Sequence, residues 1–533
     1  MGERMSRAQS GAKRLLKSLG SLKVFFRNKQ GVAGIIIIIG FAVMAIGAPL
    51  LSDKDPVRDE NLAGDIAAPI WLRYLPTWLG GDPSLSENFY AVSSSFDNDT
   101  AGWDWTNVNH TSVQWNQSYG FDSMGSLETK FTRDETGVFY NKSTIDVFDT
   151  IYYPYGGPPR TFSISAYLSA RGTSVLENKT LGTSYKVNVT VNRLVITPTV
   201  KFFIRRESDG ARWTIWPFSG TMNYTKDGEI DSALSGWVKV IVSARDSDLK
   251  IIAFGGKADV ATTTFKGTPG NFTLGMSVTF DDSYNDTIPA WTSVHLDRAT
   301  WYCAGEAYGL LGTDQHGADL WSQLVFGSRV SLYVGLLSAV ISVVIGLIVG
   351  LAAGFLGRAV DEILMRLTDL LLVIPFLPLL LVLVAIFGST MQNLVIVIGV
   401  LGWMGFARVV RAQVLSLRER TFIESAKAIG AGRTHIMIRH ILPNIMSLVY
   451  VTLASSVPGA ITAEAALSFL GFYDPTRISW GRMLNQAEFV GGGALVWWWV
   501  LFPGLCIALL AMSFIMLGFA LDEILNPKLR LRR

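Results

Sequence analysis

Histidines are the first candidates for a chemical role in this chain, because they could bind a metal ion or serve in a catalytic triad. Their spacing fits neither a metal site nor a triad, so a membrane enzyme is disfavoured and we expect no metal. The five are His110, His295, His316, His435 and His440. Cys303 lies beside a polar block and Cys506 inside an apolar run, so we expect no disulfide between them.

A nucleotide-binding loop would let the chain use ATP itself, and its signature is G-x4-G-K-[S/T]. The sequence has no such motif. The nearest stretch, Gly255-Gly256-Lys257, lacks the first glycine and is followed by Ala258. We therefore expect the chain to bind no cofactor and not to be an ATPase.

Residues 424–444 read ESAKAIGAGRTHIMIRHILPN, with small and basic residues set between long apolar stretches. The periodicity from 414 to 429 predicts one amphipathic helix. Its apolar face holds Leu415, Phe422, Ala426 and Ile429, and its polar face holds Arg420, Glu424 and Lys427. We expect Gly430 to end this helix in a left-handed conformation, Thr434 to cap a second helix, and Pro443 to lie in the first turn of the next span.

Two helices joined at an angle, with small side chains at the bend, predict a docking surface for another protein. Ser425 and Ala426 would let a partner approach the backbone closely. The alternative is an inert interfacial loop, in which the Arg420–Glu424 pair is a surface contact worth a few tenths of a kcal/mol. Composition alone does not separate the two.

Carboxylates in or beside the apolar stretches form a second group of candidates. Glu464 lies within such a stretch, where a carboxylate is costly, and is therefore a candidate for a substrate pathway. The alternative is a structural latch, hydrogen-bonded to neighbouring helix residues or to the 310–320 segment. Asp361, Glu362 and Asp369 flank a span, and we expect them to be solvated or paired with Arg366.

The elements that position these residues follow from hydropathy. The chain is 49% hydrophobic, and its net charge of +3 is too small to indicate nucleic-acid binding. Six stretches approach the about 20 apolar residues that a membrane-spanning helix needs. They are 31–51, 329–354, 370–388, 393–411, 445–470 and 495–520. The prolines expected to bend their helices are Pro375, Pro378 and Pro458.

The placement of lysine and arginine predicts the orientation of these spans. Basic residues crowd the segment 1–30, the loop 412–444 and the tail 526–533, whereas the loop 388–393 has no charge. We therefore expect both termini and the 412–444 loop to be cytoplasmic. The segment 305–328 is expected on the outer surface as an amphipathic stretch, ahead of a membrane core over 329–525.

Between 56 and 300 the hydrophobic periodicity changes to two, as in WVKVIVSA at 237–244 and FTLGMSVTF at 272–280. Alternation broken by turn residues about every ten positions predicts an antiparallel β-sandwich, on the extracellular side. FDNDTAGWDW at 96–105 and VHLDRATW at 294–301 resemble strands of jelly-roll carbohydrate-binding modules.

Tryptophans of this domain have two interpretations: they fill the sandwich core, or they form a platform on which sugars stack. They are Trp103, Trp105, Trp115, Trp213, Trp216 and Trp237.

Asparagines that begin the triplet N-x-S/T are three times as common here as the about three expected by chance. The nine are Asn98, Asn109, Asn116, Asn141, Asn178, Asn188, Asn223, Asn271 and Asn285. The excess predicts an N-glycosylated exterior surface in an archaeal or otherwise glycosylating host. The alternative is a Ser-, Thr- and Asn-rich surface that is merely soluble.

The 424–444 stretch resembles the EAA loop of ABC-importer permeases, E-A-A-x3-G-x9-I-x-L-P. The positions that match in register are Glu424, Ala426, Gly430, Leu442 and Pro443. Ser425 replaces the middle alanine and His440 the isoleucine. RHILPN, FFRNKQGVAG before the first span and AEAALSFLGF at 463–472 extend the resemblance, which is to the dipeptide/oligopeptide, MetI-like branch. Ala318 departs from this branch, in which GRD is more usual than the GAD found here.

This resemblance implies a six-helix permease of the type I ABC-importer fold, with the β-sandwich inserted after the first span. It implies half of a translocation pathway, a homologous permease subunit, an external substrate-binding protein and two cytoplasmic ATPase subunits that use ATP and Mg. The docking residues it implies are Glu424, Ser425, Ala426, Gly430, Ala431, Leu442 and Pro443. The branch implies di- and oligopeptide substrates. The alternatives are an oligosaccharide importer of the same family and a membrane-anchored glycan-binding receptor.

Overall fold

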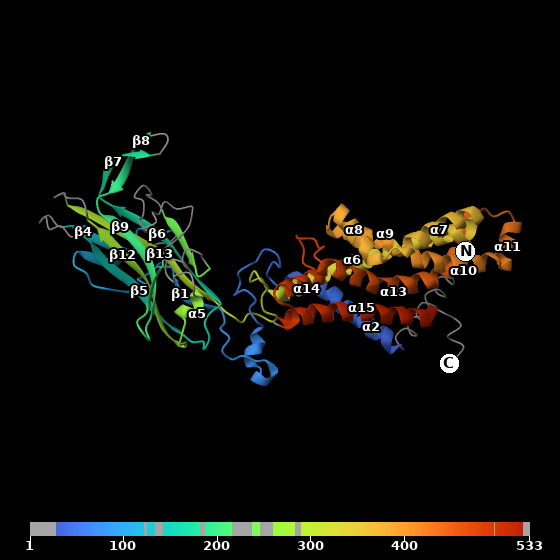
Figure 1. Ribbon diagram of the computed structural model, residues 1–533, viewed down its shortest axis with the longest axis horizontal. Helices are drawn as coiled ribbons and strands as arrows, with labels where there is room; N and C mark the ends of the chain where they lie inside the picture. Colours follow the sequence, from blue (N-terminus) through green and yellow to red (C-terminus); the bar gives the residue numbers. More distant parts are fainter. Residues whose placement is uncertain are drawn as a thin grey trace, which may run out of the picture. The chain divides into compact units, whose positions relative to one another are not determined.

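The computed structural model describes residues 28–121, 125–133, 142–181, 187–215, 237–245, 259–282, 289–494 and 496–525. The chain forms two compact units (Figure 1). The helical unit comprises Met1–Glu60 and Ala318–Arg533, and the β unit comprises Asn61–Gly317. Residues 1–27 and the tail 526–533, both expected to be cytoplasmic, lie outside the described residues.

The β unit consists of two larger antiparallel sheets and a two-stranded one. The six-stranded sheet has the order β11-β6-β13-β4-β3, with β1 also paired to β13, and the five-stranded sheet has the order β10-β9-β12-β5-β2. Strands β7 and β8 form the third sheet. The strands are β1 (Phe89–Ser94), β2 (Asp104–Trp105), β3 (Thr111–Asn116), β4 (Ser126–Arg133), β5 (Ser143–Tyr153), β6 (Thr161–Gly172), β7 (Ser174–Leu181), β8 (Val187–Leu194), β9 (Thr197–Arg206), β10 (Arg212–Ile215), β11 (Val238–Ser243), β12 (Gly270–Asp281) and β13 (Ala290–Ala304).

One hydrophobic core joins the two larger sheets, because alternate residues of each strand point inward. On β6, Phe162, Ile164, Ala166 and Leu168 are buried, while the intervening side chains are half-buried. The same core holds residues of β4, β5, β9, β12 and β13, and therefore of both sheets. The predicted antiparallel β-sandwich is confirmed.

Residues 61–68 and 305–317 form a hydrogen-bonded base of the β unit. The N–H of Ile66 donates to the carbonyl of Asp314 at 2.9 Å, which satisfies backbone groups that no sheet pairs. The segment 305–328, expected as one amphipathic stretch, is therefore divided. Its first part belongs to the β unit, and its last part is the beginning of a long helix.

The helical unit contains the apolar helices and several short ones. The helices are α2 (Lys29–Ile46), α3 (Ala48–Leu51), α6 (Leu320–Leu356), α7 (Arg358–Val373), α8 (Phe376–Phe387), α9 (Met391–Leu401), α10 (Met404–Arg418), α11 (Thr421–Ala428), α12 (Arg433–Ile436), η3 (Met437–Ile441), α13 (Leu442–Phe469), α14 (Trp480–Phe489), η4 (Gly492–Ala494) and α15 (Trp497–Leu525).

Five helical stretches in the described part of the chain are long and apolar enough to cross a membrane, or six if the bent pair α7–α8 is one span. The five are Lys29–Ile46, Leu320–Leu356, Met391–Arg418, Arg433–Phe469 and Trp497–Leu525. Helices α7 and α8 meet at 92°. The expected bend at Pro375 is confirmed: Ile374 before it is extended, as the proline ring favours. Pro458, in contrast, lies inside the uninterrupted α13.

Helix α6 packs closely against α10 along three glycines spaced four residues apart, Gly346, Gly350 and Gly354, which we call the glycine seam. A Cβ atom on Gly350 would lie 2.6 Å from Cβ of Val410, and one on Gly354 would lie 2.7 Å from Cβ of Val414. Small residues at such spacing allow two helix backbones to approach each other inside a membrane. The seam therefore fixes α6 and α10 as one rigid pair.

Candidate functional site

The loop between α10 and α13 contains the candidate docking residues, and we call residues 419–441 the coupling loop. The single helix expected over 414–429 is wrong, because α10 ends at Arg418 and α11 begins at Thr421. Arg420 is extended, with φ −83° and ψ 143°, and its N–H donates to the carbonyl of Leu417 at 3.1 Å. The break turns α11 away from the axis of α10, so the periodicity of one helix does not continue into the next.

Gly430 ends α11 in the expected left-handed conformation, with φ +88°. Its N–H donates to the carbonyl of Lys427 at 2.9 Å, and the N–H of Ala431 donates to the carbonyl of Ala426 at 3.0 Å. These are the paired hydrogen bonds of a Schellman turn. A side chain at Gly430 would meet no atom within 4 Å, so backbone conformation rather than space requires the glycine.

The N-cap of the second helix of the loop lies two residues earlier than expected. Helix α12 begins at Arg433, with Gly432 rather than Thr434 in the N-cap position. The π-helix η3 follows without a break and leads into α13, where Pro443 lies in the first turn as expected. The missing N–H of a proline does least harm at this position.

Three buried isoleucines attach the coupling loop to the long helices: Ile423 of α11, Ile436 of α12 and Ile441 of η3. They share one hydrophobic cluster with Val343 and Phe355 of α6, Val410 and Val414 of α10, and Ile445 and Val449 of α13. Displacing the loop would expose this apolar surface, which is worth roughly 2 kcal/mol for each fully buried side chain. The loop and the three helices therefore move together.

The candidate docking residues lie at the end of the helical unit, where α11 projects beyond the longer helices (Figure 1). Glu424, Ser425, Gly430 and Pro443 are exposed, and Ala426, Ala431 and Leu442 are half-buried. Ser425 donates its hydroxyl back to the carbonyl of Thr421 at 2.9 Å and so presents a small surface.

Two side chains that were expected on the apolar face of one helix are exposed. Ile429 is 87% exposed and Phe422 is 41% exposed, whereas Ile423 takes the buried position. Neither residue was among the predicted docking residues. The extended conformation of Arg420 changes which side of α11 is buried and so explains their exposure. The sequence did not reveal this break.

Two ion pairs join α7 to α10. Arg411 binds Asp361 through two nitrogens, with Nη2 lying 2.7 Å from Oδ2, and Arg408 binds Asp369. The expected pairing with Arg366 is therefore wrong for both aspartates, whereas the expected solvation holds for Asp369, whose side chain is 53% exposed. Each arginine is on α10 and its aspartate is on α7, so the pairs form only when the two helices pack together.

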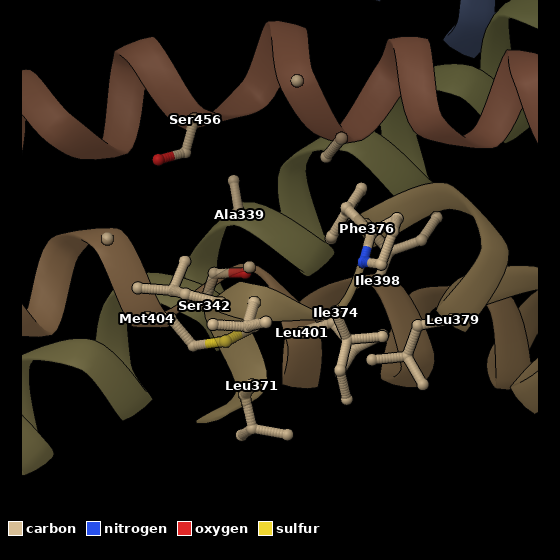
Figure 2. A pocket seen from close by; sticks show the side chains of 17 residues that line it. Ala339, Ser342, Leu371, Ile374, Phe376, Leu379, Ile398, Leu401, Met404 and Ser456 are labelled. Carbon is tan, nitrogen blue, oxygen red and sulfur yellow. The ribbon is translucent and has the colours of Figure 1, made fainter. Parts of the chain in front are cut away.

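A cavity of about 470 Å³ lies within the helical unit, beside the bend between α7 and α8. Figure 2 shows Ser342 reaching it from α6 and Ser456 from α13, with Met404 and Leu401 below them. The other described residues of the wall are apolar or glycine, and none of them is charged. Both serine hydroxyls donate to backbone carbonyls of their surroundings, at 2.8 Å each, which leaves their oxygens as acceptors.

Glu464 is buried in α13 and is not among the residues that line this cavity. Ser468, one turn further along, donates its hydroxyl to Oε1 of Glu464 at 2.7 Å. Helix α14 packs against this turn so closely that a Cβ atom on Gly481 would lie 2.7 Å from the carbonyl oxygen of Ala465. Burial and a hydrogen bond to a neighbouring residue of the same helix favour the structural latch over the pathway residue.

A buried polar cluster in the β unit is a further assembly of functional groups, which the sequence spacing did not show. His295 lies 3.1 Å from the hydroxyls of Ser126 and Ser293 and 3.7 Å from Glu128. Burial lowers the pKa of His295 to about 4, so the imidazole is neutral at pH 7. Both serines are 0% exposed. A substrate cannot reach them, and the cluster is structural rather than catalytic.

The tryptophans considered for a sugar platform do not share one surface. Trp103 is buried in the core. Trp105 and Trp213 lie on β2 and β10 of the five-stranded sheet, whereas Trp115 lies on β3 of the other sheet. Trp237 directly precedes β11, at the opposite edge of the six-stranded sheet from β3, so the described tryptophans of this set form no single platform.

Asparagines of the N-x-S/T triplets differ in their surroundings. Asn98, Asn109 and Asn271 are exposed, and Asn116 is half-buried, with its amide donating to Oε2 of Glu128 at 3.1 Å. Outside the described residues lie Asn141, Asn223, Asn285 and also Trp216, together with the side chains of Asn178 and Asn188.

Two known families match separate parts of the chain. Residues 342–531 match the family described as "Binding-protein-dependent transport system inner membrane component". Residues 20–69 match the "N-terminal TM domain of oligopeptide transport permease C". The coupling loop, the cavity and Glu464 all lie within the first match or beside it.

Several curated proteins are similar over about two fifths of the chain. The dipeptide transport system permease protein DppC of Bacillus subtilis is 36% identical over 41% of this chain and 68% of its own length. The oligopeptide transport system permease protein OppC of Haemophilus influenzae is 38% identical over 42% of this chain and 71% of its own length. The di/tripeptide transport system permease protein DppC of Pseudomonas aeruginosa is 38% identical over 44% of this chain and 77% of its own length.

Solved structures resemble each unit more distantly. An inward-facing form of the MetNI methionine ABC transporter is 20% identical with a TM-score of 0.32, covering 38% of this chain and 95% of that one. A xylan-binding domain from Paenibacillus barcinonensis is 12% identical with a TM-score of 0.21, covering 41% and 97%. Likenesses at these TM-scores carry no functional conclusion.

Proposed function

The chain belongs to the family of binding-protein-dependent transport system inner membrane components, and on that premise we propose that it forms half of a translocation pathway for di- and oligopeptides. It is a multi-pass protein of the plasma membrane and the permease subunit of an ABC importer. As a permease it is not an enzyme, since partner ATPases hydrolyse the ATP. The relatives named as dipeptide, oligopeptide and di/tripeptide permeases support peptides as the substrate class.

The coupling loop is proposed as the element that receives force from an ATPase subunit. Its docking surface comprises Glu424, Ser425, Ala426, Gly430, Ala431, Leu442 and Pro443, with the exposed Phe422 and Ile429 added to the set. The observation that carries this role is the attachment of the loop through Ile423, Ile436 and Ile441 to α6, α10 and α13. A push on the exposed side is thereby transmitted to the helices that line the cavity.

The cavity beside the α7–α8 bend is proposed as this chain's share of the substrate pathway. A wall without charge and with few hydroxyls holds no particular side chain of a substrate tightly. Peptides differ in charge and size but share a backbone with donors and acceptors, which the oxygens of Ser342 and Ser456 can meet. Such a wall suits a permease that passes many peptides and leaves selection to another protein.

The partners proposed are a homologous permease subunit that supplies the other half of the pathway, two cytoplasmic ATPase subunits and an extracellular substrate-binding protein. ATP and Mg are used by the ATPase subunits, and this chain binds no cofactor of its own. We place both termini and the coupling loop in the cytoplasm, because basic residues crowd these segments. The β unit is then extracellular.

The extracellular β unit is proposed to carry N-linked glycans, which implies an archaeal or otherwise glycosylating host. The excess of N-x-S/T triplets in this unit supports the proposal, and the exposed side chains of Asn98, Asn109 and Asn271 are suitable acceptors.

Uptake by the complete transporter in proteoliposomes tests the substrate class. Labelled di-, tri- and hexapeptides should accumulate when ATP is supplied on the side of the coupling loop, and cello- and xylo-oligosaccharides should not. Uptake of oligosaccharides alone would replace peptides by sugars while retaining the permease. If no ATPase subunit co-purifies and neither class accumulates, a membrane-anchored glycan receptor becomes the better description.

A further inference from the structure

The β unit carries an exposed apolar protrusion at residues 69–81, PIWLRYLPTWLGG, which we call the aromatic lobe. It consists of two short 3-10 helices, Ile70–Tyr74 and Thr77–Leu79. Trp78 is 80% exposed, Tyr74 is 74% exposed, and Leu79 is 50% exposed. Neighbouring Leu310 adds a further exposed apolar side chain. Monomeric soluble proteins rarely gather such residues without a partner.

The lobe is held in one shape rather than free to collapse. Leu72 is buried beneath it, and the indole N–H of Trp71 donates to the carbonyl of Leu310 at 2.8 Å. A Cβ atom on Gly81 would lie 1.9 Å from the carbonyl oxygen of Leu75, so only glycine allows the lobe to close. The exposed rings are therefore presented by the fold.

The chemistry of the lobe fits a lipid interface. Its one charged residue, Arg73, is neutralised by an ion pair with Glu87 at 2.5 Å. Backbone N–H groups of the lobe donate within it at Leu72, Leu75, Leu79, Gly80 and Gly81. Internal satisfaction of backbone groups lowers the cost of leaving bulk water.

The two most exposed rings are of the type that anchors proteins at membrane surfaces. Tyrosine and tryptophan each have an apolar body and one polar end, and they are enriched at the level of the lipid headgroups. Among the described residues, neither the hydroxyl of Tyr74 nor the indole N–H of Trp78 makes a hydrogen bond, so both ends are available to headgroups or water.

The connectivity of the chain keeps the lobe near the bilayer. Trp71 is hydrogen-bonded to Leu310, and the apolar helix α6 begins only ten residues later, at Leu320. Ten residues extend to at most about 35 Å.

From the exposure, chemistry and tethering of the aromatic lobe, we infer that Tyr74, Trp78 and Leu79 insert into the headgroup region of the membrane and anchor the β unit to it. The occupant of this surface is lipid rather than another protein. Anchoring would hold the β unit at a set distance from the bilayer. This role is additional to transport, and it does not depend on which substrate the permease carries.

Depth-dependent fluorescence quenching in proteoliposomes of the complete transporter tests the anchor. A polarity-sensitive probe is attached to Trp78→Cys and, separately, to Thr77→Cys, which keeps the tryptophan. The matched control is Trp105→Cys, a partly exposed tryptophan on β2 of the same unit. The chain without an added cysteine gives the background from Cys303 and Cys506.

Probes at positions 77 and 78 should be quenched by lipids with a nitroxide at the headgroup and be protected several-fold from aqueous iodide, relative to the probe at 105. The inference is overturned if all three probes are equally open to iodide and indifferent to nitroxide lipids. It is also overturned if positions 77 and 78 become protected only when the substrate-binding protein is added. Peptide uptake measured in the same vesicles reports separately on the proposed function.

Discussion

Arg411 of α10 and Asp361 of α7 form a two-point ion pair, with Nη2 of the guanidinium 2.7 Å from Oδ2 of the carboxylate and Nε donating to Oδ1. The pair connects the helix that leads into the coupling loop with the helix that leads into the bend beside the cavity. A bidentate arginine–carboxylate pair fixes orientation as well as distance. The two ends of the proposed transmission are thus linked by one directional contact.

Asp361→Asn should loosen this contact. The amide keeps one hydrogen bond and loses the charge, and because both side chains are partly exposed the cost is about 1 kcal/mol. The melting temperature of the complete transporter should fall by a few degrees, and peptide uptake should fall with it. Glu362→Gln, an exposed neighbour, should change neither. The exchange of Asp361→Arg with Arg411→Asp should restore most of the loss, and an exchange that is worse than either single change would contradict the pairing.

Gly430→Ala should weaken coupling without disturbing the packing of the span bundle. An alanine at φ +88° costs about 1 kcal/mol, so the turn that shapes the docking surface relaxes. We expect ATP-driven uptake and retention of the ATPase subunits to decrease several-fold. Gly430→Asn should lose less, since asparagine tolerates this conformation.

Gly432→Ala is the matched control for this prediction. Gly432 lies two residues away with φ −64° and open space for a Cβ atom, so uptake should stay near that of the parent chain. Equal losses at 430 and 432 would show that the left-handed turn is not what the ATPase recognises.

Glu464→Gln should leave transport nearly unchanged if Glu464 is a latch. Glutamine keeps an oxygen that can accept from Ser468 and keeps the volume between α13 and α14. Glu464→Leu removes the acceptor of a buried hydroxyl, which costs about 1–3 kcal/mol, and should lower the melting temperature of the transporter. The KM for peptide should be the same in both variants. A raised KM in Glu464→Gln with normal stability would instead assign the residue to the pathway.

Acid should destabilise the β unit through His295. The folded pKa of about 4 lies below the usual value near 6.5, so the unfolded chain binds the proton more tightly between these values. The contribution of His295 to the free energy of unfolding is therefore fully present above about pH 6.5. It is lost as the pH falls towards 4, and the loss is on the order of 3 kcal/mol. Thermal unfolding of the full chain followed from pH 7.5 to 4.5 should show the decline. His295→Gln should flatten it, and an equally steep decline in that variant would locate the acid sensitivity elsewhere.

Glycan occupancy should follow the surroundings of each asparagine. We expect glycopeptide mass spectrometry of the native protein to find Asn98, Asn109 and Asn271 modified. Asn116 should be poorly modified, because a glycan on its amide would break the hydrogen bond to Glu128. If the peptides at all three exposed positions are unmodified, the excess of triplets reflects a Ser-, Thr- and Asn-rich soluble surface and not glycosylation.

Periodicity predicted the larger elements because each depends on a pattern that local sequence displays. The alternation on β6 and the long apolar runs of α6 and α13 required no tertiary information. Gly430 was placed correctly for a similar reason, since its conformation is a property of one residue type in one turn.

Features that depend on contacts between distant segments were not predictable in this way. The extended Arg420 resets the face of α11, so that Ile423 rather than Ile429 is buried. The partner of Asp361 is 50 residues away on a different helix, and one sequence gives no signal of that pairing. The serines beside His295 likewise meet only when β4 and β13 pair.

The glycine seam has a consequence for how the two faces of the membrane communicate. Helix α6 has 37 residues and is therefore about 55 Å long, which exceeds the thickness of a bilayer. It packs against α10 along the glycine seam and lines the cavity with Ala339 and Ser342, near its middle, so the proposed cargo pathway and the proposed ATPase-docking loop both act on one rigid helix pair. If cargo shifts α6, thermodynamic reciprocity then fixes the size of the effect on the ATPase. Cargo must change the affinity of the chain for the ATPase by the same factor by which the ATPase changes the affinity of the chain for cargo.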